Sequence, residues 1–208
     1  FINISDISKK ELRLIIENAK LRKNKRQKIN KNAVDADTIL DGKILVMIFE
    51  KPSTRTRISF DIAVKQLGGK SLTLNPDEIH YGNGNESLHD TAKILSQYAD
   101  IVMLRTHVHK KVVDFSKYLD IPIINGLTDL NHPCQIMSDI MTYEELRGPI
   151  KNKKIAWLGD GNNIVYSLIE ASVKFDFNLS IACPKKLMPN KKIIKWAKNR
   201  KAKLLITK

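Results

Sequence analysis

The chain has 208 residues, of which 42% are hydrophobic and 28% charged, and its formal net charge at pH 7 is +14. This composition suits a globular protein of one large or two small domains. The apolar runs are too short for a transmembrane helix, and the opening "FINISDISKKELR" lacks the basic-then-apolar pattern of a secretory signal.

The first half of the chain predicts a helix followed by a series of strand–helix units. Ser8 and Glu11 form a capping-box pattern, which opens a helix that ends near Lys25. The run "KILVMIF" predicts a buried strand over residues 43–49. Further strands are predicted over 71–74, 101–105 and 121–124, and helices over 54–67, 88–98, 110–119 and 135–146.

The second half repeats the alternation after a break at Gly148 and Pro149. It predicts strands over 154–158, 179–182 and 204–206 and helices over 164–175 and 191–200. The fold class is therefore α/β, with two domains whose parallel sheets are flanked by helices. We place the domains at 1–148 and 149–208. The second is Rossmann-like but has only three strands, so we expect the chain to be C-terminally incomplete.

Polar side chains cluster where the predicted strands end, and ligands of open α/β sheets bind at that edge. One cluster opens the helix after residue 53, where unpaired backbone N–H groups and the helix dipole favour an anion. The clusters are residues 53–57, 105–107 and 131–135 and the pair Asn162 and Asn163. The arginine, histidine and glutamine side chains among them indicate an anionic substrate that also has a polar end other than a phosphate.

The segments "FEKPSTRTRISFD", "RTH", "HPCQIMSDIMTYEE" and "LGDGNN" together resemble the aspartate/ornithine carbamoyltransferase family. "FEKPSTRTR" with "HPCQ" is more similar to the ornithine branch, and the likeness runs along the whole chain. It implies that a carbamoyl group passes from carbamoyl phosphate to the δ-amine of L-ornithine, giving L-citrulline and phosphate in arginine metabolism. It also implies a homotrimer, or a multiple of trimers, that needs no metal or organic cofactor. The two cysteines, Cys134 and Cys183, fit a reducing cytoplasmic compartment.

The resemblance also assigns roles to residues. Arg55, Arg105 and His132 are the expected catalytic residues: Arg55 holds the phosphate, while Arg105 and His132, with Thr56, stabilise the oxyanion. Gln135 binds the carbamoyl amide. The full carbamoyl-phosphate set is Ser53, Thr54, Arg55, Thr56, His80, Arg105, His132, Pro133, Cys134 and Gln135, and Asn163 contacts ornithine.

Some of these residues have a second interpretation. Helix capping alone is the alternative role for Ser53 and Thr54. The loop around His80 is one residue longer than the family spacing. We expect Arg57 to brace the loop and Cys134 to pack, because the chemistry needs no protein nucleophile.

Two alternatives to an ornithine enzyme remain open, and a dinucleotide site is a third that the sequence disfavours. Gly159 and Gly161 suggest a dinucleotide site, but Ile164 occupies the third glycine position of that fingerprint. Ten Lys and Arg and no acid fall between residues 185 and 208, which would suit nucleic acid, but solvated lysines on helix faces are the preferred explanation. A sister carbamoyltransferase would use putrescine or aspartate.

The family's ornithine segments do not occur before Lys208, so we expect the 208-residue chain itself to be inactive.

Overall fold

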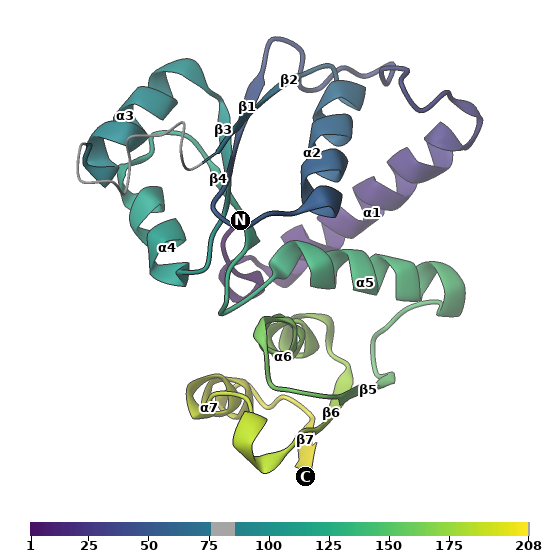
Figure 1. The fold of residues 1–208 in the computed structure, drawn as a ribbon. Helices are drawn as coiled ribbons and strands as arrows, with labels where there is room; N and C mark the ends of the chain where they lie inside the picture. The colour runs from purple at the N-terminus through teal and green to yellow at the C-terminus, as the bar shows by residue number, and fades with distance from the viewer. Residues whose placement is uncertain (76–85, 208) are drawn as a thin grey trace. The chain divides into compact units, whose positions relative to one another are not determined.

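The computed structural model describes residues 1–75 and 86–207 (Figure 1). The chain divides into two compact units, which we name by their strands. The β1–β4 unit comprises Ile2 and Leu21–Thr128, and the β5–β7 unit comprises Phe1, Asn3–Lys20 and Asp129–Lys208. No helix within the described ranges has the length and apolar character needed to cross a bilayer.

The β1–β4 unit holds a parallel sheet with the strand order β2-β1-β3-β4. Its elements are β1 (Ile44–Phe49), α2 (Thr54–Gln66), β2 (Lys70–Leu74), α3 (Leu88–Tyr98), β3 (Ile101–Arg105), α4 (His109–Tyr118), β4 (Ile123–Leu127) and the short η2 (Arg26–Lys28). Val46 and Ile48 belong to the core cluster that contains α3 and α4 residues, whereas Leu45 and Met47 pack with Val64 of α2. Alternate residues of β1 therefore face opposite helical layers, which explains its continuous apolar run.

The carboxyl ends of β1 and β3 lie side by side. Phe49 is the register partner of Arg105, and the next backbone N–H, that of Glu50, donates to the Arg105 carbonyl at 2.9 Å. The loop before α2 and the connection before α4 therefore leave the sheet at the same level. Both carry polar clusters that the sequence singled out.

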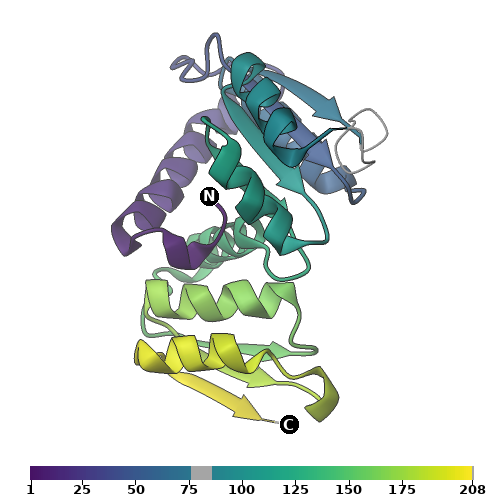
Figure 2. The ribbon, with the colours of Figure 1, turned by 90° about the vertical axis from the view of Figure 1, so that its left-hand side faces the viewer.

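The β5–β7 unit holds a parallel sheet with the strand order β5-β6-β7. Its elements are η1 (Ile4–Asp6), the part of α1 (Lys9–Lys25) up to Lys20, α5 (Pro133–Arg147), β5 (Lys154–Leu158), α6 (Asn163–Phe175), β6 (Asn178–Ala182), η4 (Lys185–Leu187), α7 (Lys191–Asn199) and β7 (Leu204–Thr207). Helices α6 and α7 lie on one face of the sheet (Figure 2). On the other face Leu158 and Leu205 are 79% and 59% exposed, so no described residue covers them.

A buried carboxylate joins α1 to α5 within the β5–β7 unit. Glu144 accepts hydrogen bonds from Arg13 at 2.7 and 2.8 Å, from Lys20 at 2.7 Å and from the Ile150 backbone N–H at 3.2 Å. Burial alone would raise the pKa of Glu144, but these donors outweigh it and hold the pKa below its ordinary value. Glu144 is therefore ionised, and it holds α1 against α5.

A second buried carboxylate, Glu170 of α6, binds the backbone near the N-terminus of the chain. Its Oε2 accepts from the backbone N–H groups of Ile4 and Ser5 at 3.1 and 3.3 Å. Desolvation raises the pKa of Glu170 to about 7, against the opposing effect of these hydrogen bonds. Its charge state therefore changes near neutral pH.

The predicted α/β fold with two parallel sheets flanked by helices is confirmed. The largest boundary error concerns β4, predicted over 121–124 and observed as Ile123–Leu127. Asn125 and Gly126 fall outside the predicted strand, but Asn125 is buried and donates to the Ile2 carbonyl at 3.1 Å. A Cβ at Gly126 would lie 2.3 Å from the Met103 sulfur, so a side chain there would have to displace Met103. The domain boundary between residues 148 and 149 stays a prediction.

Candidate functional site

The loop from β1 to α2 presents the start of a helix at the edge of the sheet. Ser53 is the N-cap of α2 in extended conformation, and its Oγ accepts from the Thr56 backbone N–H at 3.2 Å. The capping role of Ser53 is thus present in the structure. Because the first N–H groups of a helix lack intrahelical partners, the positions of Thr54 and Arg55 suit an anion.

Arg105, the last residue of β3, reaches this helix start. Its Nη1 donates to the Thr56 hydroxyl at 3.3 Å. Burial, and then the nearby charge of Arg55, lower the pKa of Arg105. Its Nε is buried and has no hydrogen-bond partner among the described residues. Two neighbouring guanidinium groups, of which Arg105 has an unused donor, favour a ligand of negative charge.

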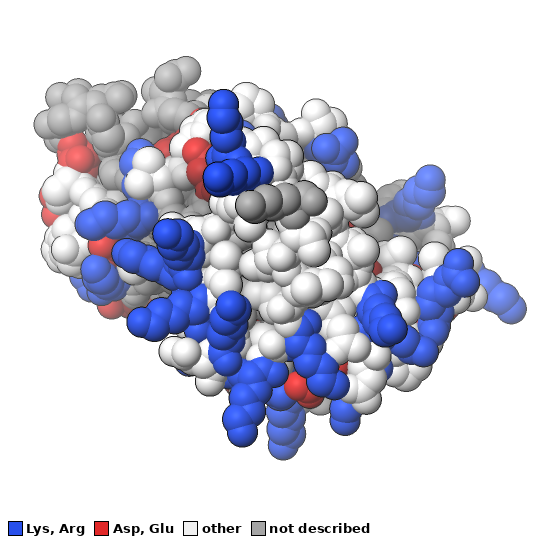
Figure 3. All heavy atoms as spheres, turned by 90° about the horizontal axis from the view of Figure 1, so that it is seen from below, with Lys and Arg blue, Asp and Glu red and all other residues white. Residues whose placement is uncertain are grey.

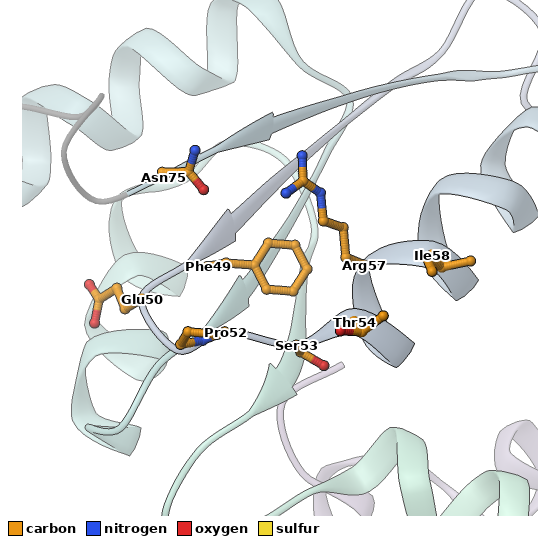
Figure 4. Close-up of a pocket in the computed structure, with 8 residues that line it drawn as sticks. All are labelled: Phe49, Glu50, Pro52, Ser53, Thr54, Arg57, Ile58 and Asn75. Carbon is orange, nitrogen blue, oxygen red and sulfur yellow. The ribbon is translucent and has the colours of Figure 1, made fainter.

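A cavity of about 630 Å³ opens beside this loop (Figure 4). It shares Ser53 and Thr54 with the predicted carboxyl-edge cluster, whereas Arg55, Thr56 and Arg105 do not line it. The lining residues are Phe49, Glu50, Pro52, Ser53, Thr54, Arg57, Ile58 and Asn75. The cavity therefore overlaps only the edge of the predicted anion site.

Arg57 lies on the cavity side of the loop. In Figure 4 its guanidinium and the Ser53 hydroxyl point to opposite sides of the α2 start. Its charge contributes to lowering the pKa of Asp61, after larger contributions from Lys65 and Ser71. Arg57 and Ser53 therefore both line the cavity with side chains that point in different directions, and the bracing role of Arg57 stays a prediction.

The predicted residues 132–135 lie in the β5–β7 unit, at the N-terminus of α5. His132 is the N-cap position, and its backbone N–H donates to the Ser167 hydroxyl at 2.8 Å. Pro133 occupies the first helical position, where its missing N–H costs nothing. The Gln135 side chain is exposed and donates to Asp139 at 2.9 Å.

Cys134 is half-buried beside the same helix start. Desolvation raises the pKa of its thiol to about 11. The thiol is therefore protonated at neutral pH, which does not suit a nucleophile. Its packing or backbone-contact role stays a prediction.

The "GDGNN" segment is explained by capping and packing. Asn162 caps α6, and its Oδ1 accepts from the Ile164 and Val165 backbone N–H groups at 2.9 and 3.3 Å. A Cβ at Gly161 would lie 2.4 Å from the Pro189 backbone nitrogen, so only glycine fits. Asn163 is the first residue of α6. The glycine thus has a packing role that does not depend on a dinucleotide.

The structure brings Ser53, Thr54, Arg55, Thr56 and Arg105 to one edge of the β1–β4 sheet. It places residues 132–135 and Asn163 at two helix starts of the other unit. His80 lies outside the described residues. Over the described ranges, no group of three His, Cys, Asp or Glu side chains has the arrangement of a metal site.

Sequence reasoning missed two side chains next to the site, Glu50 and Lys111, and it placed Thr106 in the 105–107 cluster without giving it a role. The Glu50 carboxylate accepts from the Thr106 hydroxyl and from the Lys111 ammonium. Thr106 stands in the quoted "RTH" segment and Glu50 in "FEKPSTRTR". A charged residue directly after a buried strand was therefore a usable signal.

Comparison with known proteins gives matches along nearly the whole chain. Residues 1–145 match the carbamoyl-phosphate-binding domain of aspartate/ornithine carbamoyltransferase, and residues 151–207 match its Asp/Orn-binding domain. Ornithine carbamoyltransferases of Brucella ovis and Rhizobium meliloti are 48% and 46% identical over the full chain. The chain spans 64% and 66% of the lengths of these two relatives.

Solved structures agree. Ornithine carbamoyltransferase from Pyrococcus furiosus matches with a TM-score of 0.90 at 41% identity, over 99% of this chain and 65% of that one. The catalytic subunit of M. jannaschii aspartate transcarbamoylase matches with a TM-score of 0.83 at 33% identity, over 100% of this chain and 68% of that one. The chain therefore belongs to the aspartate/ornithine carbamoyltransferase family.

Proposed function

We propose that this protein transfers the carbamoyl group of carbamoyl phosphate to the δ-amine of L-ornithine, giving L-citrulline and phosphate in arginine metabolism. The observation that carries the proposal is the Arg55–Arg105 pair at the start of α2, next to the hydroxyl of Thr56. A dianionic phosphate is the ligand that two such guanidinium groups and a helix N-terminus bind best. Relatives at 46–48% identity are named ornithine carbamoyltransferases.

The β1–β4 unit supplies the residues of the proposed phosphate-binding site. Arg55 forms charge-assisted hydrogen bonds to phosphate oxygens, and the Ser53 and Thr54 backbone and hydroxyl groups add donors. Arg105 uses its remaining donors on the phosphate and on the carbonyl oxygen that gains negative charge. The departing phosphate accepts the proton of the attacking amine, so catalysis consists mainly of positioning and preorganised electrostatics.

The roles of the remaining residues rest on the family resemblance. His132 donates to the carbonyl oxygen, Gln135 binds the carbamoyl amide and Asn163 contacts ornithine. Pro133 and Cys134 complete the carbamoyl-phosphate set. His80, outside the described residues, belongs to the same proposed set.

We also propose that the protein acts as a homotrimer or a multiple of trimers in the cytoplasm, without a cofactor. Mass photometry or light scattering tests the assembly. The cytoplasmic location rests on the sequence and on two free cysteines, Cys134 and Cys183. Arginine synthesis and breakdown use the same reaction, so this proposal covers both.

Citrulline formation tests the function directly. Carbamoyl phosphate is offered with L-ornithine, L-aspartate or putrescine to the protein carrying any residues that follow Lys208 in its gene. We expect citrulline with ornithine and no product with the other two amines. Product with aspartate or putrescine alone would establish the sister activity instead. The catalytic subunit of an aspartate transcarbamoylase is among the solved structures that match this chain.

The basic residues near the C-terminus offer little support for nucleic acid. The lysines of α7 are exposed, while Ile193 and Ala197 are buried beneath them, as in an ordinary amphipathic surface helix. On the face drawn in Figure 3, Lys and Arg are spread over several parts of the surface with uncharged residues between them. A DNA titration over increasing salt is expected to show no specific binding.

A further inference from the structure

We infer that Glu50 is a positioning residue, which fixes the loop carrying Ser53 and Thr56 against the strand end carrying Arg105. This inference rests on the proposed binding of carbamoyl phosphate and names a residue that acts through its neighbours. Glu50 stands three positions before Ser53 in the loop that follows β1. The structure shows four hydrogen bonds that tie it to the β3–α4 connection.

The backbone of Glu50 supplies the first tie. Its N–H donates to the Arg105 carbonyl at 2.9 Å, one residue beyond the end of the β1–β3 ladder. The hydrogen bond extends the pairing of the two strands into the loop. This hydrogen bond therefore fixes the position of the Glu50 backbone relative to that of Arg105.

The side chain of Glu50 supplies the other three. Its Oε2 accepts from the Thr106 hydroxyl at 2.5 Å, and both carboxylate oxygens accept from the Lys111 ammonium, at 3.0 and 3.1 Å. Thr106 is fully buried, and its Oγ1 also accepts from the Val108 backbone N–H at 3.3 Å. The carboxylate thus joins the loop to the start of α4 through a buried hydroxyl that has its acceptor in Glu50.

These contacts bear on the anion site because its two halves come from different segments. Ser53 and Thr56 follow Glu50, whereas Arg105 precedes Thr106 in β3. The side-chain link from Arg105 to Thr56 is long, at 3.3 Å. The shorter and charged hydrogen bonds of Glu50 therefore do more to set the relative position of the two halves. Small errors in such positioning reduce ligand binding and catalysis strongly.

Asp100 provides a matched control at the opposite end of the same two strands. Its carboxylate accepts from the Lys43 ammonium at 2.8 Å and from the Ile44 backbone N–H at 2.9 Å. It thus joins the amino ends of β1 and β3 with the same chemistry that Glu50 uses at their carboxyl ends. Replacing Asp100 disturbs the sheet but not the loop before α2.

The test compares Glu50→Ala, Glu50→Gln, Lys111→Met and Asp100→Ala with the unaltered protein. Carbamoyl phosphate and, separately, inorganic phosphate are titrated by calorimetry well below the melting temperature of each variant. We expect Glu50→Ala to weaken carbamoyl phosphate binding at least tenfold. Glu50→Gln keeps an acceptor for Thr106, so it should fall between Glu50→Ala and the unaltered protein. Asp100→Ala should lower the melting temperature and leave the affinity within twofold.

A double variant and a ligand-free measurement complete the test. Glu50→Ala with Lys111→Met should bind no more weakly than Glu50→Ala alone, because the lysine acts through the carboxylate. Amide hydrogen exchange of residues 50–57 should rise in Glu50→Ala and stay unchanged in Asp100→Ala.

The outcomes separate this inference from the proposed function. If the unaltered protein fails to bind carbamoyl phosphate, the proposed function is wrong, and hydrogen exchange still decides the role of Glu50. Normal carbamoyl phosphate binding by the unaltered protein that is lost in Arg55→Ala would support the proposed function. If, in that case, Glu50→Ala matches Asp100→Ala in both affinity and amide hydrogen exchange, the positioning role of Glu50 is overturned while the function stands.

Discussion

Arg105 at the end of β3 donates to the Thr56 hydroxyl in the first turn of α2, at 3.3 Å. This contact joins two segments that are 49 positions apart in the chain. It places a half-buried guanidinium, whose buried Nε has no described partner, beside a helix N-terminus. This relationship underlies the proposed anion site.

Arg105→Lys should weaken carbamoyl phosphate binding although it preserves the positive charge. A lysine ammonium cannot donate to Thr56 and to two ligand oxygens in the fixed fork geometry of a guanidinium. Loss of one hydrogen bond to a charged ligand costs about 1.5–3 kcal/mol, or roughly ten- to a hundredfold in affinity. Calorimetric titration measures the change, and an affinity equal to that of the unaltered protein would exclude the fork.

Ser53→Ala and Ser87→Ala should have the same effect on stability and different effects on binding. Both serines are N-caps, and their hydroxyls accept from Thr56 N–H at 3.2 Å and Asp90 N–H at 3.1 Å. Losing either cap should reduce the free energy of unfolding by about 1 kcal/mol. Only Ser53→Ala should also weaken carbamoyl phosphate. Equal affinities in the two variants would show that Ser53 is a cap and nothing more.

Much of the fold could be predicted from the sequence because hydrophobic periodicity and helix boundaries are local signals. β3, α3 and β5 were predicted with the bounds that the structure has. β4 was misplaced because Asn125 and Gly126 look like a turn. A distant hydrogen bond to Ile2 and close contact with Met103 keep them in the strand. Such long-range reasons leave no local trace in the sequence.

The candidate site likewise contains some residues that local sequence signals indicate and others that only the fold brings together. Ser53, Thr56 and Arg105 could be named from their positions after strands and from a family resemblance. The contacts of Glu50 with Thr106 and Lys111 could not, because they depend on the strand order β2-β1-β3-β4. The alternation of strands and helices in the sequence does not determine this strand order, because the order depends on how the helices and strands pack together.

Glu144→Ala should destabilise the protein far more than Glu17→Ala. The two carboxylates share the same cations, since Glu17 lies 4.0 Å from Arg13 and 3.8 Å from Lys20. The side chain of Glu144 is only 3% exposed, whereas that of Glu17 is 56% exposed. Removing the buried partner should cost about 3 kcal/mol of unfolding free energy, against less than about 1 kcal/mol for the exposed one. Urea unfolding of both variants measures this difference, and equal losses would contradict it.

Glu170 should make the protein less stable as the pH rises from about 5 to 8. Its folded pKa of about 7 lies above the ordinary value of 4.5, so between these values the folded state binds more protons than the unfolded state. The contribution is therefore present below pH 4.5 and lost as the pH rises through 7, by about 3 kcal/mol in total.

Glu170→Gln provides the control for this pH dependence. The amide stays neutral and keeps an oxygen to accept from Ile4 and Ser5. Its stability should fall less between pH 5 and 8 than that of the unaltered protein. Parallel pH profiles for the two proteins would show that Glu170 does not titrate in this range.

The central claim is that the Arg55–Arg105 site at the start of α2 binds the phosphate of carbamoyl phosphate. The most direct measurement is the dissociation constant of carbamoyl phosphate for Arg55→Ala, with the exposed Arg147→Ala as its control. The account predicts an affinity loss of roughly a hundredfold for Arg55→Ala and no change for Arg147→Ala. An unchanged dissociation constant in Arg55→Ala would contradict it.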